Sequence, residues 1–212
     1  SCNIRMNNKM TKTWIHQPHL LKKIEDKFGE EIKNLINYNT PGTPKGVIIR
    51  GSKAKISKEK HQLYRSGVGM LLYLVKHTQP DIANVVREMS KVLDGPSPAA
   101  YKEMLRVIKY VINTKNYALK LEPKFEFANK WMITIFSDSD YATDPEQRTS
   151  VSGYVLYICG IPITWRSRGQ KSITLSSSEA EYVAMSEAVK EVKFVYQLLQ
   201  DMEINVELPI IV

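Results

Sequence analysis

The chain has 212 residues, of which 43% are hydrophobic and 25% are charged, and its formal net charge is +8. This share of apolar side chains supports a buried core and excludes a chain that is disordered throughout. Two cysteines, Cys2 and Cys159, are too few for a disulfide framework or a CxxC zinc pattern, and the most apolar run, residues 67–75, is too short to span a bilayer. We therefore expect a soluble intracellular protein without a membrane partner.

Positive charge is concentrated in the first part of the chain. Residues 1–130 carry 24 Lys and Arg against 11 Asp and Glu, whereas residues 131–212 carry 6 against 11. A basic part followed by an acidic part suits a protein that holds a polyanion electrostatically and performs metal chemistry on it. Two solvated surfaces of opposite sign would give the same counts, so charge alone leaves both interpretations open.

Residues 1–16 carry a thin apolar pattern and predict an edge strand or a hairpin. A helix is expected from Pro18, because proline favours the first turn and apolar residues then recur every three or four positions. Gly29 is expected to break or bend this helix. A turn-rich linker at 40–46 and a basic loop at 50–60 follow.

A helical block comes next, with one helix over residues 63–75, a second from 80 to 93 and a third that starts at 97–98. Residues 117–121 alternate and predict a short closing strand, and residues 124–130 form the boundary of the block. The third helix carries three basic residues away from its apolar side: Lys102, Arg106 and Lys109. They are candidate nucleic-acid contacts or simply solvated side chains.

Residues 131–141, WMITIFSDSDY, predict a buried strand that ends in two acidic residues. By the two-residue alternation of a strand, Asp138 shares one face with Thr134 and Phe136, and Asp140 continues that face if the strand persists. Asp138 is therefore attached to the core rather than to a loop. Carboxylates at the rim of a sheet suit a divalent metal ion.

Two further strands are expected at 153–159 and 163–166, after a polar turn at 142–149. The tight reversal between them makes all three strands antiparallel neighbours. A basic loop, RSRGQK, follows the third strand and lies near the acidic rim. Its candidate phosphate contacts, which a simple solvated turn would also explain, are Arg166, Arg168 and Lys171.

Ser177 or Ser178 is predicted to cap a long helix that runs to about Met202. At 100° per residue Glu181 heads the buried stripe, whereas Glu179 falls about 160° away on the solvent side. An acid at the head of such a stripe needs a partner, a hydrogen bond or a metal. Ser178-x-x-Glu181 also matches a capping box, in which Glu181 would only reach back to a backbone N–H. Combined with Asp138 on a neighbouring strand, Glu181 favours a shared metal site.

The acidic part resembles the ribonuclease H domain of copia-type LTR retrotransposon Pol polyproteins, on the string SDSDYA…RTSVSGYVLYICGIPITWRSRGQKSITLSSSEAEYVAMSEA. The preceding part is similar to the connection region behind their reverse transcriptase, on the string YRSGVGMLLYLVKHTQPDIANVVREMSKVLDGPS…RVIKYVINT. The segment WIHQPHLLKKIEDKFG is similar to the thumb before it. The resemblance covers nearly the whole chain, and its motifs occur in the family's order and spacing.

This resemblance implies a mixed α/β fold of the ribonuclease H type, in which four acidic residues hold two Mg²⁺ or Mn²⁺ ions and the RNA strand of an RNA/DNA hybrid is hydrolysed. The family's first acid maps to Asp138 and its second to Glu181. One ion would activate the attacking water and the other would stabilise the leaving 3′ oxygen. The implied partners are an RNA/DNA hybrid or another nucleic acid and the rest of the Pol polyprotein. The implied location is cytoplasmic, in a virus-like particle, or nuclear.

The chain also departs from the family. The third acid is expected at the end of the next strand, but residues 208–212 only begin that strand, and the fourth acid lies further downstream. Asp140 or Asp144 is a weak substitute for a missing ligand. The paired-aspartate turn of the polymerase is absent too. We therefore expect a catalytically incomplete fragment.

Three segments are expected within this fragment: a thumb-like remnant at 1–46, a helical connection region at 47–128, and the start of a ribonuclease H-like domain at 129–212. Its fold class is α+β or mixed α/β, with three antiparallel strands, a long helix and the start of a fourth strand. A nucleic-acid-binding module without chemistry is the alternative function. A relic gene product without a selected role is the second alternative, and an unpaired strand edge would make it prone to aggregate.

Overall fold

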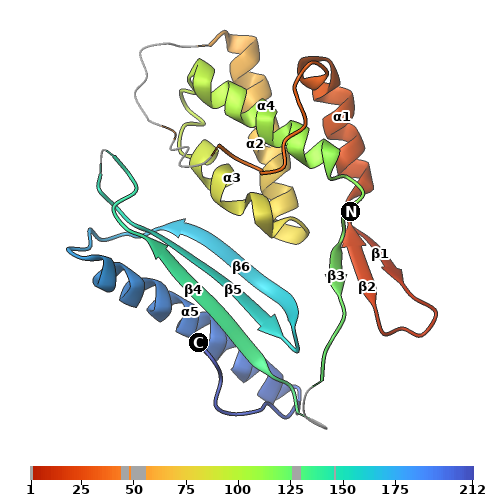
Figure 1. Ribbon diagram of the computed structural model, residues 1–212, viewed down its shortest axis with the longest axis vertical. Coiled ribbons are helices and arrows are strands. Elements are labelled where there is room, and N and C mark those ends of the chain that lie inside the picture. The colour runs from red at the N-terminus through yellow and green to blue at the C-terminus, as the bar shows by residue number, and fades with distance from the viewer. Residues whose placement is uncertain (1, 44–47, 49–55, 126–129, 146) are drawn as a thin grey trace. The chain divides into compact units, whose positions relative to one another are not determined.

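The computed structural model describes every residue except 1, 44–47, 49–55, 126–129 and 146 (Figure 1). The chain is a mixed α/β protein, in agreement with the predicted fold class, and it divides into two compact units. Most of the first unit is Trp14–Leu119, and most of the second is Lys120–Val212. The predicted boundaries at 46/47 and 128/129, and much of the predicted basic loop at 50–60, lie outside the described residues.

The predicted hairpin at the start of the chain is present. Strand β1 (Asn3–Met6) pairs with β2 (Thr13–His16), and β3 (Leu119–Leu121) lies beside β2 in the same small sheet. At the turn, the side chain of Asn7 accepts hydrogen bonds from two backbone N–H groups, those of Thr11 and Lys12. An Asn side chain that mimics backbone in this way stabilises a tight reversal.

The helical block was also predicted correctly in outline. Its helices are α1 (Pro18–Ile32), α2 (Lys58–His77), α3 (Ala83–Ser90) and α4 (Pro98–Asn113), with a 3₁₀ turn η1 (Pro80–Ile82) before α3. The predicted break at Gly29 is wrong, because α1 continues through it. The buried stripe of α1, which includes Ile24 and Phe28, spans the glycine, and burial of that stripe outweighs the weak helix propensity of one residue.

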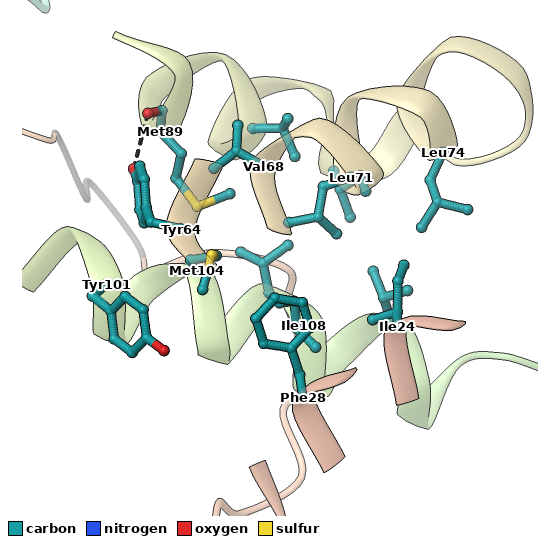
Figure 2. Close-up of a cluster of buried hydrophobic side chains, with 14 of the residues drawn as sticks. Ile24, Phe28, Tyr64, Val68, Leu71, Leu74, Met89, Tyr101, Met104 and Ile108 are labelled. Atoms are coloured by element: carbon teal, nitrogen blue, oxygen red, sulfur yellow. Dashed lines mark hydrogen bonds between the residues drawn. The ribbon is translucent and has the colours of Figure 1, made fainter. Parts of the chain in front are cut away.

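These helices enclose one apolar core, which Figure 2 shows around Phe28, Leu71 and Met104. Tyr64 is fully buried within it, and its hydroxyl donates a hydrogen bond of 2.9 Å to the carbonyl oxygen of Met89. Burial raises the pKa of this phenol well above its usual value. The neutral phenol thus ties α2 to α3 from inside the core.

The second unit contains the predicted antiparallel strands. Strands β4 (Ile133–Asp140), β5 (Val151–Ile158) and β6 (Ile161–Gly169) lie in that order, and helix α5 (Ser177–Asp201) runs along one face of their sheet (Figure 1). The third strand is longer than the predicted 163–166. The reversal between β5 and β6 has φ of 49° at Cys159 and 75° at Gly160. Two successive positive φ angles are typical of the two-residue hairpin turn, in which glycine is favoured.

The last residues run beside β4 in the parallel direction. Trp131 pairs with Val206 and Thr134 pairs with Ile211, and the N–H of Ile135 donates a hydrogen bond of 3.1 Å to the carbonyl oxygen of Ile211. These are isolated bridges, and the described residues 208–212 form no strand of their own, so of the predicted fourth strand only the pairing at Ile211 is present.

The described helices include none that is both long and apolar enough to cross a lipid bilayer.

Candidate functional site

Strand β4 separates two faces as its alternation predicts. Ile133 and Ile135 are buried against α5, whereas Phe136, Asp138 and Asp140 are exposed. Asp138 therefore lies on a core strand but points away from the helix-covered face. Directly across the sheet its partner on β5 is Gly153, so no side chain from that position covers the carboxylate.

Glu181 approaches this strand from α5. Its Oε1 atom accepts a hydrogen bond of 3.4 Å from the backbone N–H of Ser139, the residue that follows Asp138. The prediction that Glu181 heads a buried stripe is wrong, because its side chain is exposed and Ala180 is the first buried residue of the helix. The stripe slants around the helix, so the first turn presents Glu181 at the margin of the contact with the sheet rather than inside it.

The N-terminal cap of α5 is formed by residues other than Glu181. The N-cap is Ser176 rather than the predicted Ser177 or Ser178, and its hydroxyl accepts a hydrogen bond from the N–H of Glu179 at 3.1 Å. The Glu179 carboxylate in turn accepts one from the N–H of Leu175 at 2.6 Å. The predicted capping box at Ser178 and Glu181 is therefore displaced by two residues, and the carboxylate of Glu181 does not cap the helix.

A buried polar cluster lies where β5, β6 and the start of α5 meet. The side chain of Gln170 donates hydrogen bonds of 2.9 Å to the hydroxyl of Ser152 and to the carbonyl oxygen of Ala180. Beside it, the hydroxyls of Ser150 and Thr174 are 2.9 Å apart. This cluster was not predicted from the sequence, because Gln170 lies in a segment that was interpreted as a basic loop. Its only sequence signal is its position directly after a strand.

Two oxygens in this region are buried without a hydrogen-bond partner: Oγ of Ser139 and Oε1 of Gln170. Buried polar atoms are normally satisfied, so these two stand out. Both residues adjoin the elements that carry the candidate carboxylates, since Ser139 follows Asp138 and Gln170 contacts Ala180.

The proposed substitutes for missing ligands have structural surroundings of their own. Asp140 is the last residue of β4, and its carbonyl oxygen accepts a hydrogen bond from the hydroxyl of Thr143. Asp144 lies in the following turn, where its carboxylate accepts a hydrogen bond of 2.9 Å from the N–H of Gln147. Over the described residues, no group of three or more His, Cys, Asp or Glu side chains is arranged to hold a metal ion. Among the described residues, the structure therefore brings one carboxylate, that of Glu181, from α5 to the backbone of β4.

The predicted basic loop is largely strand. Arg166 and Arg168 belong to β6, opposite Tyr154 and Ser152 of β5, and Lys171 is exposed just beyond the strand. β6 is separated from β4 by β5, so these cations lie across the sheet from Asp138. Burial, followed by the carboxylate of Glu191 on α5, raises the pKa of the Tyr154 phenol, and the phenol donates a hydrogen bond of 3.2 Å to that carboxylate.

The basic residues of α4 differ in their surroundings. Lys102 is exposed and Lys109 is half-buried. The guanidinium of Arg106 lies 4.2 Å from the centre of the Tyr38 ring and donates hydrogen bonds to Thr40 and Gly42. Arg106 thus holds the segment that follows α1, a role that sequence alone did not indicate.

Comparison with known proteins gives several similar sequences. Secreted RxLR effector protein 161 of Plasmopara viticola is 38% identical over 132 residues, which are 62% of this chain and 90% of that protein. The retrovirus-related Pol polyprotein from transposon RE1 of Arabidopsis thaliana is 30% identical over 167 residues, 79% of this chain and 11% of the polyprotein. That from transposon TNT 1-94 of Nicotiana tabacum is 28% identical over 204 residues, 92% of this chain and 14% of the polyprotein.

The chain thus spans most of the short effector but only 11% and 14% of the two polyproteins. No protein-family model matches the chain, and no solved structure matches it.

Proposed function

Because the chain belongs to the family of copia-type retrotransposon Pol polyproteins, we propose that residues 129–212 are the amino-terminal part of a ribonuclease H-like domain. Residues 1–46 and 47–128 then correspond to the thumb and connection regions. One observation carries the proposal: Glu181 of α5 contacts the backbone of Ser139, next to Asp138 on β4. Glu181 comes from a distant part of the sequence and reaches the backbone of the strand that carries Asp138, although the Asp138 side chain lies on the face of β4 away from α5.

The proposed parent reaction is hydrolysis of the RNA strand of an RNA/DNA hybrid. Asp138 and Glu181 would hold Mg²⁺ or Mn²⁺, since carboxylates are the hard oxygen ligands that these ions prefer, and Mg²⁺ is often bound by one or two carboxylates plus waters. A bound ion would supply an activated water and charge stabilisation of the leaving oxygen. The carboxylates act as ligands, and no side chain is required as a proton shuttle.

The 212 residues contain candidates for two of the four acids of the parent site, so we expect little or no turnover. The test is cleavage of a labelled RNA/DNA hybrid in Mg²⁺ and in Mn²⁺, with the Asp138→Asn variant alongside. Trace cleavage that is equal in both proteins is the expected result. Robust cleavage by the unaltered chain that disappears in Asp138→Asn would contradict the expected incompleteness.

Metal binding is tested separately from turnover. Mn²⁺ is paramagnetic, so an ion held by the two carboxylates should broaden the amide NMR signals of residues 137–140 at low Mn²⁺ concentration. We expect the broadening to weaken in both Asp138→Asn and Glu181→Gln, and to persist in Glu179→Gln, which alters an acid of the helix cap. Broadening that ignores all three substitutions would rule out the proposed ligands.

A second candidate function, nucleic-acid binding without chemistry, is favoured by the excess of positive charge in residues 1–130, which contain 24 Lys and Arg and 11 Asp and Glu. Such binding weakens steeply as salt rises. It would be unaffected by chelation of metal ions or by Asp138→Asn, and this insensitivity separates it from the metal-dependent function.

A further inference from the structure

We propose that Gln170 is a positioning residue, which holds the first turn of α5 against the sheet and so determines where the Glu181 carboxylate lies relative to β4. The inference rests on the proposed role of Glu181 as a metal ligand. The contacts that support it involve neither metal nor nucleic acid, so it is testable without either.

Gln170 links both sides of the candidate site through one buried side chain, which is only 5% exposed. Its backbone N–H donates a hydrogen bond of 2.8 Å to the carbonyl oxygen of Ser150, which fixes the residue at the end of β6. Its amide nitrogen then donates to Ser152 and to Ala180, each at 2.9 Å. Ala180 immediately precedes Glu181, so this nitrogen holds the backbone next to the carboxylate.

The other end of the link leads to β4. Ser152 is the direct partner of Ser139 in the pairing of β5 with β4, and Ser139 donates the backbone N–H that Glu181 accepts. The path from Gln170 through Ser152 to Ser139 and the path through Ala180 to Glu181 therefore meet at one hydrogen bond. A displacement of Gln170 would therefore change the distance between the Ser139 N–H and the Glu181 carboxylate.

The orientation of the amide follows from its partners. A backbone carbonyl oxygen only accepts hydrogen bonds, so the NH₂ group of Gln170 must face Ala180. This choice leaves Oε1 of Gln170 buried without a partner. Here both donors of the amide are used to join β5 to α5.

The first turns of α5 need such a link because they bury only small apolar side chains. The buried residues at this end of the helix are small: Ala180, Ala184 and Ala188. Larger buried side chains, Val192, Val195 and Leu199, lie further along the helix. Alanine buries little apolar area, so alanines permit close approach without fixing the lateral position of the helix. The hydrogen bond between Tyr154 and Glu191 lies ten residues beyond Glu181 and restrains a later turn.

The test uses the amide NMR signal of Ser139 in the full chain. The chemical shift of an N–H depends on the group that accepts its hydrogen bond, so the Ser139 signal is recorded at one fixed pH in the unaltered chain and in Glu181→Gln. Asp138 and Asp140 are close but are present in both proteins, so their effect cancels in the comparison. The difference between the two proteins is the part that belongs to Glu181.

We expect this Glu181-dependent part to be lost in Gln170→Leu, which keeps the approximate size but no donor. Ser152→Ala is a milder variant, in which the amide keeps Ala180 but loses its anchor on β5, and we expect a partial loss. The matched control is Thr174→Val, which removes a buried hydroxyl of the same cluster whose hydrogen bond goes to Ser150. It should lower stability and leave the Ser139 response unchanged.

Several outcomes would overturn the inference. A full Glu181-dependent response in Gln170→Leu and in Ser152→Ala would show that Gln170 does not position the carboxylate. An equal loss of the response in Thr174→Val would show that Gln170 contributes only to general packing. If the unaltered chain showed no Glu181-dependent response, the contact between Glu181 and Ser139 would itself be absent. Absence of Mn²⁺ binding would count against the proposed function only, because the Ser139 measurement uses no metal ion.

Discussion

Two carboxylates that lie two positions apart on α5, Glu179 and Glu181, are both exposed but have different contacts. Glu179 accepts the N–H of Leu175 and donates its own N–H to Ser176, so it is part of the helix start. Glu181 accepts the N–H of Ser139 on β4 instead. A glutamate already used as a cap has little freedom to bind a metal, which leaves Glu181 as the candidate ligand.

The serine run before α5 provides a residue-scale prediction. Ser176→Ala should lower the free energy of unfolding by about 1 kcal/mol, because it removes the side chain that satisfies a first-turn N–H. Ser178→Ala should be neutral or stabilising by up to about 0.5 kcal/mol, because this serine lies within the helix, where alanine has the higher propensity. Urea unfolding of the two variants measures both values.

The opposite order of the two variants would restore the capping box at Ser178 and Glu181, and would weaken the case for Glu181 as a ligand. Sequence alone did not separate these alternatives, because residues 176–178 are all serine and each is an acceptable cap. Both Ser176 and Ser178 are followed by an acid three residues later, so the choice depends on the backbone of Ser176, whose φ of −145° and ψ of 161° are extended.

At the scale of elements, β4 is the part that period-two reasoning predicted best. Ile135 is 1% exposed and packs in the core beneath α5, whereas its neighbour Phe136 is 64% exposed on the other face. Ile135→Ala should therefore cost about 2–5 kcal/mol of stability, the usual range for a large core side chain cut to alanine. Phe136→Ala should cost about 1 kcal/mol, since it loses strand propensity and its ring contact with Tyr157.

Denaturant unfolding of these two neighbours tests which face of β4 is buried. Similar costs for both would mean that the face of Phe136 and Asp138 is also covered, and Asp138 would then be closed to a metal ion with its waters. An unchanged slope of the transition with denaturant is the control that the unfolded states are comparable.

Prediction from the sequence succeeded where one physical factor dominates. Alternation of apolar residues is set by burial, so the strands and the division of β4 into two faces were predictable, and Pro18 marked the start of α1 for a similarly local reason. Gln170 was not predictable, because its importance comes from a carbonyl ten residues later in the chain. The exposure of Glu181 was missed because helix periodicity does not say where the helix overhangs the sheet.

At the scale of the whole chain, the uneven charge is the feature that bears on nucleic acid. The excess of Lys and Arg lies in residues 1–130, yet these cations are not equivalent. Arg106 is engaged with Tyr38, Thr40 and Gly42, so replacing it should reduce stability rather than remove a phosphate contact. Lys102, which is exposed, and Lys109, which is half-buried, are the better candidates on α4.

Nucleic-acid binding is best tested through its salt dependence. The association constant for an RNA/DNA hybrid, measured by fluorescence anisotropy over a range of NaCl concentrations, should fall linearly on a log–log plot, with a slope of about −0.9 for each phosphate contact in a duplex. The double variant Lys102→Gln/Lys109→Gln should make the slope shallower by up to about 2 if both lysines contact phosphate. Lys190→Gln/Lys193→Gln is the matched control, because it removes the same charge from exposed positions of α5 in the acidic part. An equal change of slope in the two double variants would show that net charge alone, rather than a surface on α4, governs binding.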